Sequence, residues 1–334
     1  MIADSSNSIV DVPGIKIGHS TDLKAVTGCT VILCEKGAVA GVDQRGGGPG
    51  TKETDLLKPV NSVQKVHAIM LAGGSAFGLD SASGAMKYLE EKGIGYPVGP
   101  HRIPIVPSAI LFDLFIGDGN RRPDAEMGYQ ACLSASTTLP EQGSVGAGTG
   151  ATVGKILGIG QSTKSGIGST SIKLAGGTIV GAIVAVNAIG DVIDPDSNQI
   201  IAGLRSISKG PIKVGGDKLF ANTLDVLKSF VGQKLLSLAA RSNTVIGVVA
   251  TNAKLDKPQA ARVAQMAQNG VVRTIIPANT MHDGDTIFAL STGNKNTDVN
   301  IVGAVAAQVM SQSILNAVKN AKSLGGVPAI SDLT

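Results

Sequence analysis

The sequence predicts an α/β protein, and three observations support this fold class. Short apolar runs alternate with segments of helical periodicity along the whole chain. Tryptophan is absent and aromatic residues make up 3% of the 334 residues, so the core must be packed from Val, Ile, Leu and Ala. The 44 glycines allow close approach of backbones, which favours tightly layered strands and helices.

The first part of the chain predicts strands that alternate with one clear helix. Val66–Leu71 reads as a strand, and the helical stretch Ala76–Lys92 follows it. From Gly143 to Gly177 the chain is dense in Gly, Ser and Thr, which predicts strands joined by tight turns. Thr178–Val186 is a β-branched run that predicts a further strand, with Asn187 at its end.

A polar junction separates two strongly patterned elements near residue 243. Apolar side chains at three- and four-residue spacing predict an amphipathic helix over Asn222–Arg241. Thr244–Thr251 predicts a buried strand, because it is a continuous run of small and β-branched residues. Asn243 therefore lies between a predicted helix and a predicted strand.

The rest of the last third predicts helix, strand and helix. Pro258 is placed to open a helix that Asn269-Gly270 can close. Thr286–Leu290 predicts a strand, and Thr297 can cap a long Ala/Val helix that runs towards Gly325. No repeat and no domain boundary is visible, so the chain is expected to form a single folded unit.

Composition excludes several classes of partner. Charged residues are only 16% of the chain and the net charge is +4, without a Lys/Arg run, so neither nucleic acid nor an anionic membrane is expected to bind. No uncharged apolar run reaches the roughly 18 residues of a membrane span, and the polar start lacks the layout of a signal peptide. The odd number of cysteines fits a reducing compartment, so we expect a cytoplasmic protein.

Several short patterns fail the chemistry that they suggest. Gly150–Lys155 lacks the glycine spacing and the hydroxyl of a phosphate-binding loop, and Gly74–Phe77 lacks the second glycine of a nucleophile elbow. Asp194–Asn198 begins like a calcium loop but is better explained as a surface turn. The histidines are scattered, so no metal and no cofactor is predicted; they are His19, His67, His101 and His282.

Thr244 is the strongest candidate nucleophile. A Thr at the start of a buried strand is ordinarily a strand residue, but here Asn243 precedes it at the junction and the acidic pair Asp283-Gly-Asp285 follows downstream. If the bond before Thr244 breaks, the freed α-amino group has a reference pKa of about 7.7–8.0 and can act as general base beside the hydroxyl. The same hydroxyl can attack the Asn243 carbonyl, so one geometry would serve self-cleavage and turnover.

Over nearly its whole length the chain resembles the N-terminal-nucleophile peptidases of the L-aminopeptidase/D-amidase-esterase type and the nylon-oligomer (6-aminohexanoate-oligomer) hydrolases. The stretches that carry the resemblance are Asp11-Val-Pro-Gly-Ile-Lys-Ile-Gly-His19, Gln44-Arg45-Gly-Gly-Gly-Pro-Gly50-Thr51, Leu71-Ala-Gly-Gly-Ser-Ala-Phe-Gly-Leu-Asp80, Gly146-Ala-Gly-Thr-Gly-Ala-Thr-Val-Gly-Lys155 and Val186-Asn187-Ala.

The resemblance implies a four-layer αββα sandwich, cleaved into residues 1–243 and 244–334 and assembled as a closed tetramer without metal or cofactor. It makes Thr244 the nucleophile, Asn187 a donor to the developing oxyanion and Lys155 a nearby cation. Asp283 and Asp285 would orient the Thr244 amine and hydroxyl. The plainer alternatives are a solvated lysine at Lys155 and polar turns at Asn187, Asp283 and Asp285.

The expected substrate is a small linear amide or peptide. The aminopeptidase branch generally uses a serine nucleophile, with a Ser and a Glu two residues apart where this chain has Asp283 and Asp285. Thr244 with this acidic pair is more similar to the nylon-oligomer branch, which favours cleavage of amide bonds in short linear polyamides or peptides. Release of N-terminal residues from peptides and amino-acid amides is the alternative.

Two other classes remain open. An acyltransferase of the ornithine acetyltransferase type has a similar fold and an N-terminal Thr, but its Lys-Gly and Ala-Thr-Met stretches are missing around Thr244. An uncleaved binding or scaffold protein would keep the architecture without the chemistry. The mass of the chain on a denaturing gel separates that alternative from a self-cleaving hydrolase.

Overall fold

The computed structural model describes residues 7–208, 213–230, 232–233 and 243–333. The strands are β1 (Lys16–Asp22), β2 (Thr27–Gln44), β3 (Thr51–Lys52), β4 (Val66–Ala72), β5 (Tyr96–Val98), β6 (His101–Ile103), β7 (Ser108–Ile110), β8 (Thr152–Val153), β9 (Thr163–Lys164), β10 (Ile167–Lys173), β11 (Ile179–Asn187), β12 (Asp191–Asp194), β13 (Gln199–Ala202), β14 (Thr244–Ala253), β15 (Ile275–Ile276) and β16 (Thr286–Lys295). The α-helices are α1 (Ser81–Glu91), α2 (Ala125–Ser134), α3 (Thr223–Lys228), α5 (Lys257–Thr274) and α6 (Val299–Lys319).

A nine-stranded mixed sheet dominates the fold. Its order is β10-β11-β14-β16-β2-β4-β7-β3, with β1 paired to β2. Neighbours are antiparallel except for two parallel pairs, β14 with β16 and β4 with β7. The first half of the 18-residue strand β2 pairs with β1 and β4, and its second half pairs with β16. The sheet therefore divides along β2 into two layers.

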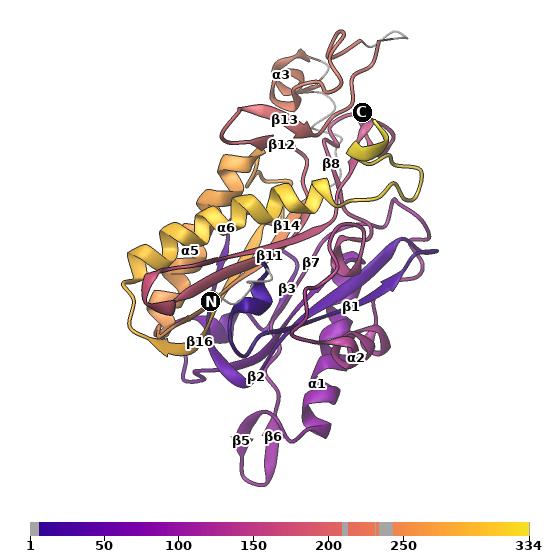
Figure 1. Cartoon of the computed structure of the whole chain (residues 1–334). Helices are drawn as coiled ribbons and strands as arrows, with labels where there is room; N and C mark the ends of the chain where they lie inside the picture. The colour runs from indigo at the N-terminus through magenta and orange to yellow at the C-terminus, as the bar shows by residue number, and fades with distance from the viewer. Residues whose placement is uncertain (1–6, 209–212, 231, 234–242, 334) are drawn as a thin grey trace.

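The apolar residues form three cores around these layers. One core lies between them and joins Ile32 and Ile69 to Ile183, Ile246 and Phe288. A second core lies under α5 and α6, outside the layer that contains β11 and β14, and a third lies under α1 and α2, outside the layer that contains β4. Figure 1 shows the two helix pairs on opposite sides of the strands. The predicted four-layer αββα sandwich is confirmed.

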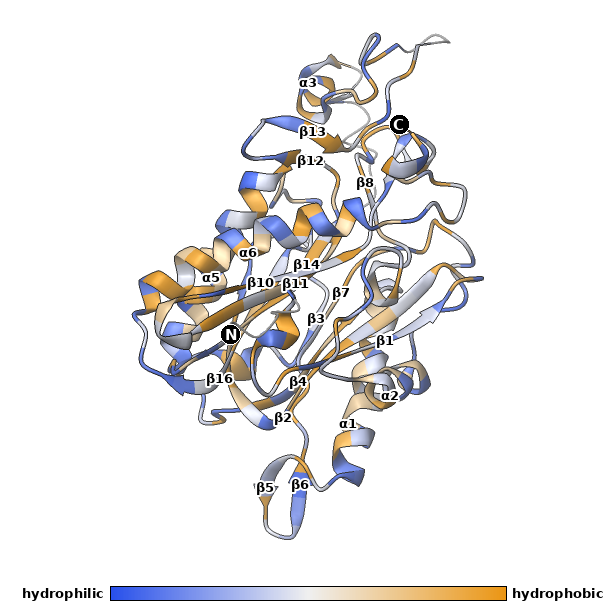
Figure 2. Cartoon of the chain, in the orientation of Figure 1, coloured by the Kyte–Doolittle hydropathy of each residue, from blue (hydrophilic) through white to orange (hydrophobic). Residues whose placement is uncertain are grey.

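Strand β14 is buried along its whole length, as its composition predicts. All ten residues from Thr244 to Ala253 are buried, and the seven residues of β4 are buried as well. Figure 2 shows these central strands as largely hydrophobic. A strand covered on both faces has no polar side to alternate with, which explains the continuous apolar run.

Helix α5 begins where the sequence predicts and ends later. Asp256 caps it by accepting a hydrogen bond from the Gln259 N–H, and Pro258 lies in the first turn. The prediction that Asn269-Gly270 closes the helix is wrong, because α5 continues to Thr274. A Cβ atom on Gly270 would lie 2.3 Å from the Ala307 carbonyl oxygen. This glycine therefore allows α5 and α6 to pack closely and does not end a helix.

Helix α6 is shorter than predicted at both ends. Asp298 caps it in place of Thr297, and it ends at Lys319 rather than near Gly325. By length and composition it could cross a membrane, since its mean hydropathy is 1.5 over an 18-residue window. However, 67% of that window is buried inside the protein, against α5, β10 and β11. Its apolar composition is that of a core helix.

The predicted amphipathic helix over Asn222–Arg241 is interrupted. Asn222 caps α3 by accepting from the Asp225 N–H, but the helix ends at Lys228 and Ser229 is extended. The Ser229 hydroxyl donates to the Val226 carbonyl and accepts from the Gly232 N–H, so it takes up backbone groups at the break. Residues 231 and 234–241 of the predicted helix lie outside the described residues.

Candidate active site

The five predicted site residues come together at one end of the central strands. Thr244 is the first residue of β14 and Asn187 is the last residue of β11, and the two are register partners in the sheet. Asp283 and Asp285 immediately precede β16, which pairs with β14 on its other side. Lys155 follows β8 and reaches the end of β11. Segments far apart in the sequence thus meet around Thr244.

The Thr244 hydroxyl contacts the peptide bond that precedes it. Its Oγ1 donates a hydrogen bond to the carbonyl oxygen of Asn243. The Gly284 N–H donates to the same oxygen at 2.9 Å. Asn243 and Thr244 are 3% and 5% exposed, so water hardly competes for this carbonyl. Two donors therefore polarise the carbonyl group that Thr244 would attack.

Gly284 is a site residue that the motif analysis did not identify. It contributes a backbone N–H, and its missing side chain leaves space for the Thr244 hydroxyl, because a Cβ atom there would lie 3.0 Å from Thr244 Oγ1. The sequence did carry a signal in the glycine between Asp283 and Asp285. Asp-Gly is also a common turn dipeptide, so residue type alone does not distinguish the two uses.

Asn187 is held by contacts at both ends of its side-chain amide. Its Oδ1 accepts from Lys155 Nζ at 2.9 Å and from the Thr152 N–H at 3.1 Å. Its Nδ2 donates to the Phe112 carbonyl oxygen at 2.8 Å. Lys155 Nζ also donates to the Asn187 carbonyl oxygen at 2.8 Å. The Thr152 hydroxyl donates to the same Oδ1 at 3.5 Å. These contacts fix the orientation of the amide, and Phe112 acts through its backbone carbonyl, so its residue type does not reveal this contact.

The acidic pair ties the start of β14 to the loop before β16. Asp285 accepts from the Val245 N–H at 2.7 Å and from the Asn279 N–H at 2.9 Å. Asp283 accepts from the Thr280 N–H at 2.7 Å. Both carboxyl groups are 2% exposed. They are buried groups that hold the backbone at the start of β14 and in the loop before β16.

The buried ionisable groups have strongly shifted pKa values. Burial lowers the pKa of Lys155 to about 7, although Asp283, Asp113 and Asp285 oppose this shift by favouring the ammonium form. Burial and the neighbouring Asp283 raise the pKa of Asp285 to about 7, and burial raises the pKa of Asp283. Groups that titrate near neutrality in a closed site are suited to proton transfer.

The stretch Arg45–Gly50, which carries part of the resemblance, flanks the acidic loop. The Arg45 N–H donates to the Asp285 carbonyl oxygen at 2.9 Å, and the Gly48 N–H donates to the Asp283 carbonyl oxygen at 2.9 Å. The Gly47 N–H adds a bond of 3.0 Å to Thr280. The stretch therefore supports the acidic loop through its backbone.

A large cavity lies away from these residues. Its volume is about 1590 Å³, and it is bordered by β13, α3 and the C-terminal residues Ile330 and Ser331. None of the five predicted site residues lines it. Thr244 is enclosed, at 5% exposure, and lies outside this open space.

Comparisons with known proteins identify the family of the chain. The sequence pattern of peptidase family S58 matches residues 7–329. An aminopeptidase of Mycobacterium leprae, described as uncharacterized, is 40% identical over 98% of this chain and 94% of its own length. A 6-aminohexanoate-oligomer endohydrolase of Kocuria sp. is 29% identical over 92% of this chain and 85% of its own length.

Solved structures show the same architecture. A β-aminopeptidase of Burkholderia sp. superposes with a TM-score of 0.69 at 21% identity, covering 98% of this chain and 93% of that one. The L-aminopeptidase D-Ala-esterase/amidase of Ochrobactrum anthropi, described as a variant of the Ntn hydrolase fold, gives 0.69 at 18% identity, covering 97% and 88%. The chain thus belongs to peptidase family S58 and is an amide-bond hydrolase with the N-terminal-nucleophile hydrolase fold.

Proposed function

We propose that the chain cleaves itself between Asn243 and Thr244 and then uses Thr244 as an N-terminal nucleophile. The observation that supports this most directly is the hydrogen bond from the Thr244 hydroxyl to the Asn243 carbonyl, which also accepts from Gly284. Attack of Oγ1 on the carbonyl carbon forms an ester, breaks the C–N bond and moves the hydroxyl proton to the leaving nitrogen. Water then hydrolyses the ester and frees the threonine hydroxyl.

Turnover in this proposal repeats the same chemistry on a substrate amide. The free α-amino group of Thr244 takes the hydroxyl proton, since its reference pKa of about 7.7–8.0 lies close to neutrality. The attacked carbonyl oxygen becomes negative, and the Asn187 amide with the nearby Lys155 ammonium stabilises that charge. Asp285 holds the Val245 N–H and so fixes the residue that follows the nucleophile.

For the substrate, we propose short linear polyamides such as 6-aminohexanoate oligomers, or peptides. The 6-aminohexanoate endohydrolases among the relatives support this class. Phe115 and Met281 are 66% and 68% exposed, and they lie on the segments that hold Asn187 and Asp283. Apolar side chains at these positions suit a methylene chain. Release of single N-terminal residues is the second candidate, and the mycobacterial aminopeptidases support it.

Intact-mass spectrometry tests self-cleavage. The parent is expected to give two chains, one ending at Asn243 and one beginning with Thr244, and Thr244→Ser is expected to give the same two chains because it keeps a hydroxyl. Thr244→Ala should remain a single chain. Thr251→Ala is the matched control, since it removes a buried threonine hydroxyl from the same strand, and it should still be cut. A single uncut chain in the parent sample would contradict the proposal.

The products from a linear 6-aminohexanoate tetramer distinguish internal from terminal cleavage. Internal cleavage releases dimer early in the reaction, whereas a terminal mode releases monomer and trimer. Chromatography with mass detection at low conversion separates the two. Amino-acid amides that are hydrolysed while the tetramer stays intact would favour the aminopeptidase alternative.

For assembly, we propose a homotetramer of processed protomers. The hairpin of β5 and β6 supports an intermolecular contact, because it projects from the body (Figure 1) and exposes Tyr96, Val98 and Ile103. An isolated two-stranded hairpin is only marginally stable in water, so a partner surface would stabilise it. Native mass spectrometry gives the number of protomers directly.

A further inference from the structure

A second buried polar cluster centres on Asp113, the residue that follows Phe112, whose carbonyl oxygen holds the Asn187 amide. Asp113 is 5% exposed, and both of its carboxylate oxygens accept hydrogen bonds. Oδ1 accepts from the Gly74 N–H at 2.7 Å, and Oδ2 accepts from the Thr27 hydroxyl at 2.7 Å. A buried carboxylate with two short hydrogen bonds has a fixed position.

Two glycines of the motif stretches make room for this carboxylate. A Cβ atom on Gly73 would lie 2.1 Å from Asp113 Oδ2, and a Cβ atom on Gly150 would lie 2.4 Å from Asp113 Cβ. Gly73 belongs to the stretch Leu71–Asp80 and Gly150 to the stretch Gly146–Lys155. These two glycines take no direct part in the proposed hydrolysis. Their role is to leave space for the Asp113 side chain.

Asp113 is joined to the candidate active site by its own backbone. It follows Phe112, whose carbonyl oxygen accepts from Asn187 Nδ2 at 2.8 Å. The direction of that carbonyl depends on the peptide between Phe112 and Asp113, and the clamped side chain of Asp113 holds one end of that peptide.

We propose that Asp113 is a positioning residue for amide hydrolysis, which aims the Asn187 amide through the Phe112 carbonyl and supplies a buried negative charge to Lys155. This inference rests on the proposed function, because it assigns Asn187 and Lys155 the roles given there.

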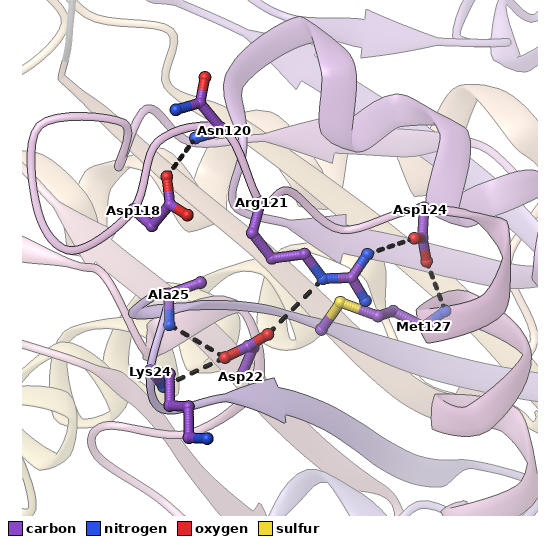
Figure 3. A network of polar contacts seen from close by, with 8 residues as sticks. All are labelled: Asp22, Lys24, Ala25, Asp118, Asn120, Arg121, Asp124 and Met127. Atoms are coloured by element: carbon purple, nitrogen blue, oxygen red, sulfur yellow. Dashed lines mark hydrogen bonds and ion pairs between the residues drawn. The ribbon is translucent and has the colours of Figure 1, made fainter.

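The segment after Asp113 is also anchored at the surface. Figure 3 shows Arg121 between Asp22, at 3.6 Å, and Asp124, at 2.6 Å. These side chains are partly exposed, and such ion pairs contribute only about 0–1 kcal/mol. The surface contacts therefore cannot replace the buried clamp. They do provide a control on the same segment.

The charge of Asp113 acts on two buried lysines. Lys155 is influenced by Asp283, Asp113 and Asp285, all of which raise its pKa against the effect of burial. Asp113 also raises the pKa of Lys164 against the effect of burial, and burial raises the pKa of Asp113 itself. Removal of the Asp113 charge takes away one of the three anions that favour the Lys155 ammonium, so the pKa of Lys155 must fall.

Asp113→Asn and Asp113→Ala separate charge from geometry. An amide can keep its oxygen on the Gly74 N–H and turn its NH₂ to the Thr27 hydroxyl, which can accept, so Asp113→Asn removes mainly the charge. Asp113→Ala removes both contacts. Arg121→Met is the control on the same segment. Thr27→Val and Thr27→Ser form a second pair that probes the clamp if the Asp113 variants do not fold.

The first readout is the titration midpoint of Lys155. It is measured by NMR on protein with lysine labelled with ¹³C at Cε, and the Lys155 signal is assigned by its absence in Lys155→Arg. We expect a lower midpoint in Asp113→Asn and no change in Arg121→Met. This readout needs no substrate, so it decides the charge coupling even if the proposed amide hydrolysis fails. An unchanged midpoint in folded Asp113→Asn would overturn this part of the inference.

The second readout is the split between kcat and KM on a linear amide. Misaiming a catalytic donor can lower the rate by as much as about 100-fold, so Asp113→Ala should lower kcat by at least about tenfold while KM changes less than about twofold. Thr27→Val should lower kcat less, and Thr27→Ser should restore it. The positioning role is refuted if Asp113→Ala and Thr27→Val both fold and keep the parent kcat.

Discussion

At the scale of single residues, buried ions are the unusual feature of this protein. Lys164 is fully buried, and its Nζ donates to three backbone carbonyls, those of Gly148, Ala151 and Ser165, at 3.2, 2.9 and 2.5 Å. Burial lowers the pKa of Lys164 to about 7. The Lys164 side chain therefore closes the turn that carries Gly150, next to Asp113.

Lys164→Met should destabilise the fold and change how stability depends on pH. Each buried carbonyl that loses its donor costs about 1–3 kcal/mol, so we expect a loss of at least about 2 kcal/mol. Between pH 7 and the ordinary lysine pKa of 10.5, the unfolded parent binds a proton at this residue that the folded parent does not. The unfolding free energy of the parent therefore rises with pH in this window, by at most about 1.4 kcal/mol per unit from this group, and the variant lacks that contribution.

Urea unfolding at pH 7, 8 and 9 measures both effects. The exposed Lys36→Met is the matched control, and it should reproduce the pH dependence of the parent. If the parent and Lys164→Met differ by the same free energy at all three pH values, Lys164 does not titrate as described.

At the scale of elements, the crossing of α5 and α6 shows how a glycine can decide packing. Alanine is a better helix former than glycine by about 1 kcal/mol, so Gly270→Ala would stabilise an exposed helix. Here the added methyl group would meet the Ala307 carbonyl oxygen at 2.3 Å. The helices must move apart to admit it, and overpacking of this kind costs about 1–3 kcal/mol.

We therefore expect Gly270→Ala to be less stable than the parent by about 1–3 kcal/mol. Asn269→Ala, at the exposed neighbouring position, should be as stable as the parent or slightly more stable. Thermal unfolding of the two variants side by side measures the difference. Equal or higher stability of Gly270→Ala would show that the crossing adjusts without cost.

The same crossing illustrates what the sequence could and could not predict. Continuous apolar runs located the strand at Val66–Leu71 and the buried strand from Thr244, because a strand that is buried on both faces has no polar positions to alternate with. The role of Gly270 was missed, since a glycine before the end of a helix looks the same whether it closes the helix or admits a neighbour. The break at Ser229 was missed because the apolar spacing continues through it.

In the candidate site, the sequence singled out residues by their side chains and missed the backbone groups that contact them. Thr244, Asn187 and the acidic pair stand out by residue type and by resemblance to the family. The Gly284 N–H contacts the Asn243 carbonyl and the Phe112 carbonyl contacts the Asn187 amide, but nearly every residue has such backbone groups. Their direction is set by strand register and turn geometry, which a single sequence does not specify.

At the scale of the whole molecule, the proposed cut does not divide the fold. Strands β14 and β16 belong to residues 244–334, yet they lie between β11 and β2, which belong to residues 1–243. The inner core likewise joins Ile246 and Phe288 to Ile32 and Ile69. Neither part can bury its apolar surface without the other.

The two chains of the processed protein should therefore stay associated in native buffer. Size-exclusion chromatography is expected to elute both chains together, at the volume of the uncut Thr244→Ala protein. Denaturant should separate them. Independent elution of the two chains in native buffer would contradict the central position of β14 in a shared sheet.

The enclosure of the Asn243–Thr244 bond also determines how the rate of maturation depends on protein concentration. The two residues of this bond are at most 5% exposed, so a second protein chain cannot reach the bond in the folded chain, and the proposed attack comes from Thr244 of the same molecule. The proposed cleavage is therefore unimolecular. The mature fraction of a sample would depend on the time since each chain folded and would not change on dilution. An isolated molecule would therefore mature at the same rate as one in a concentrated sample.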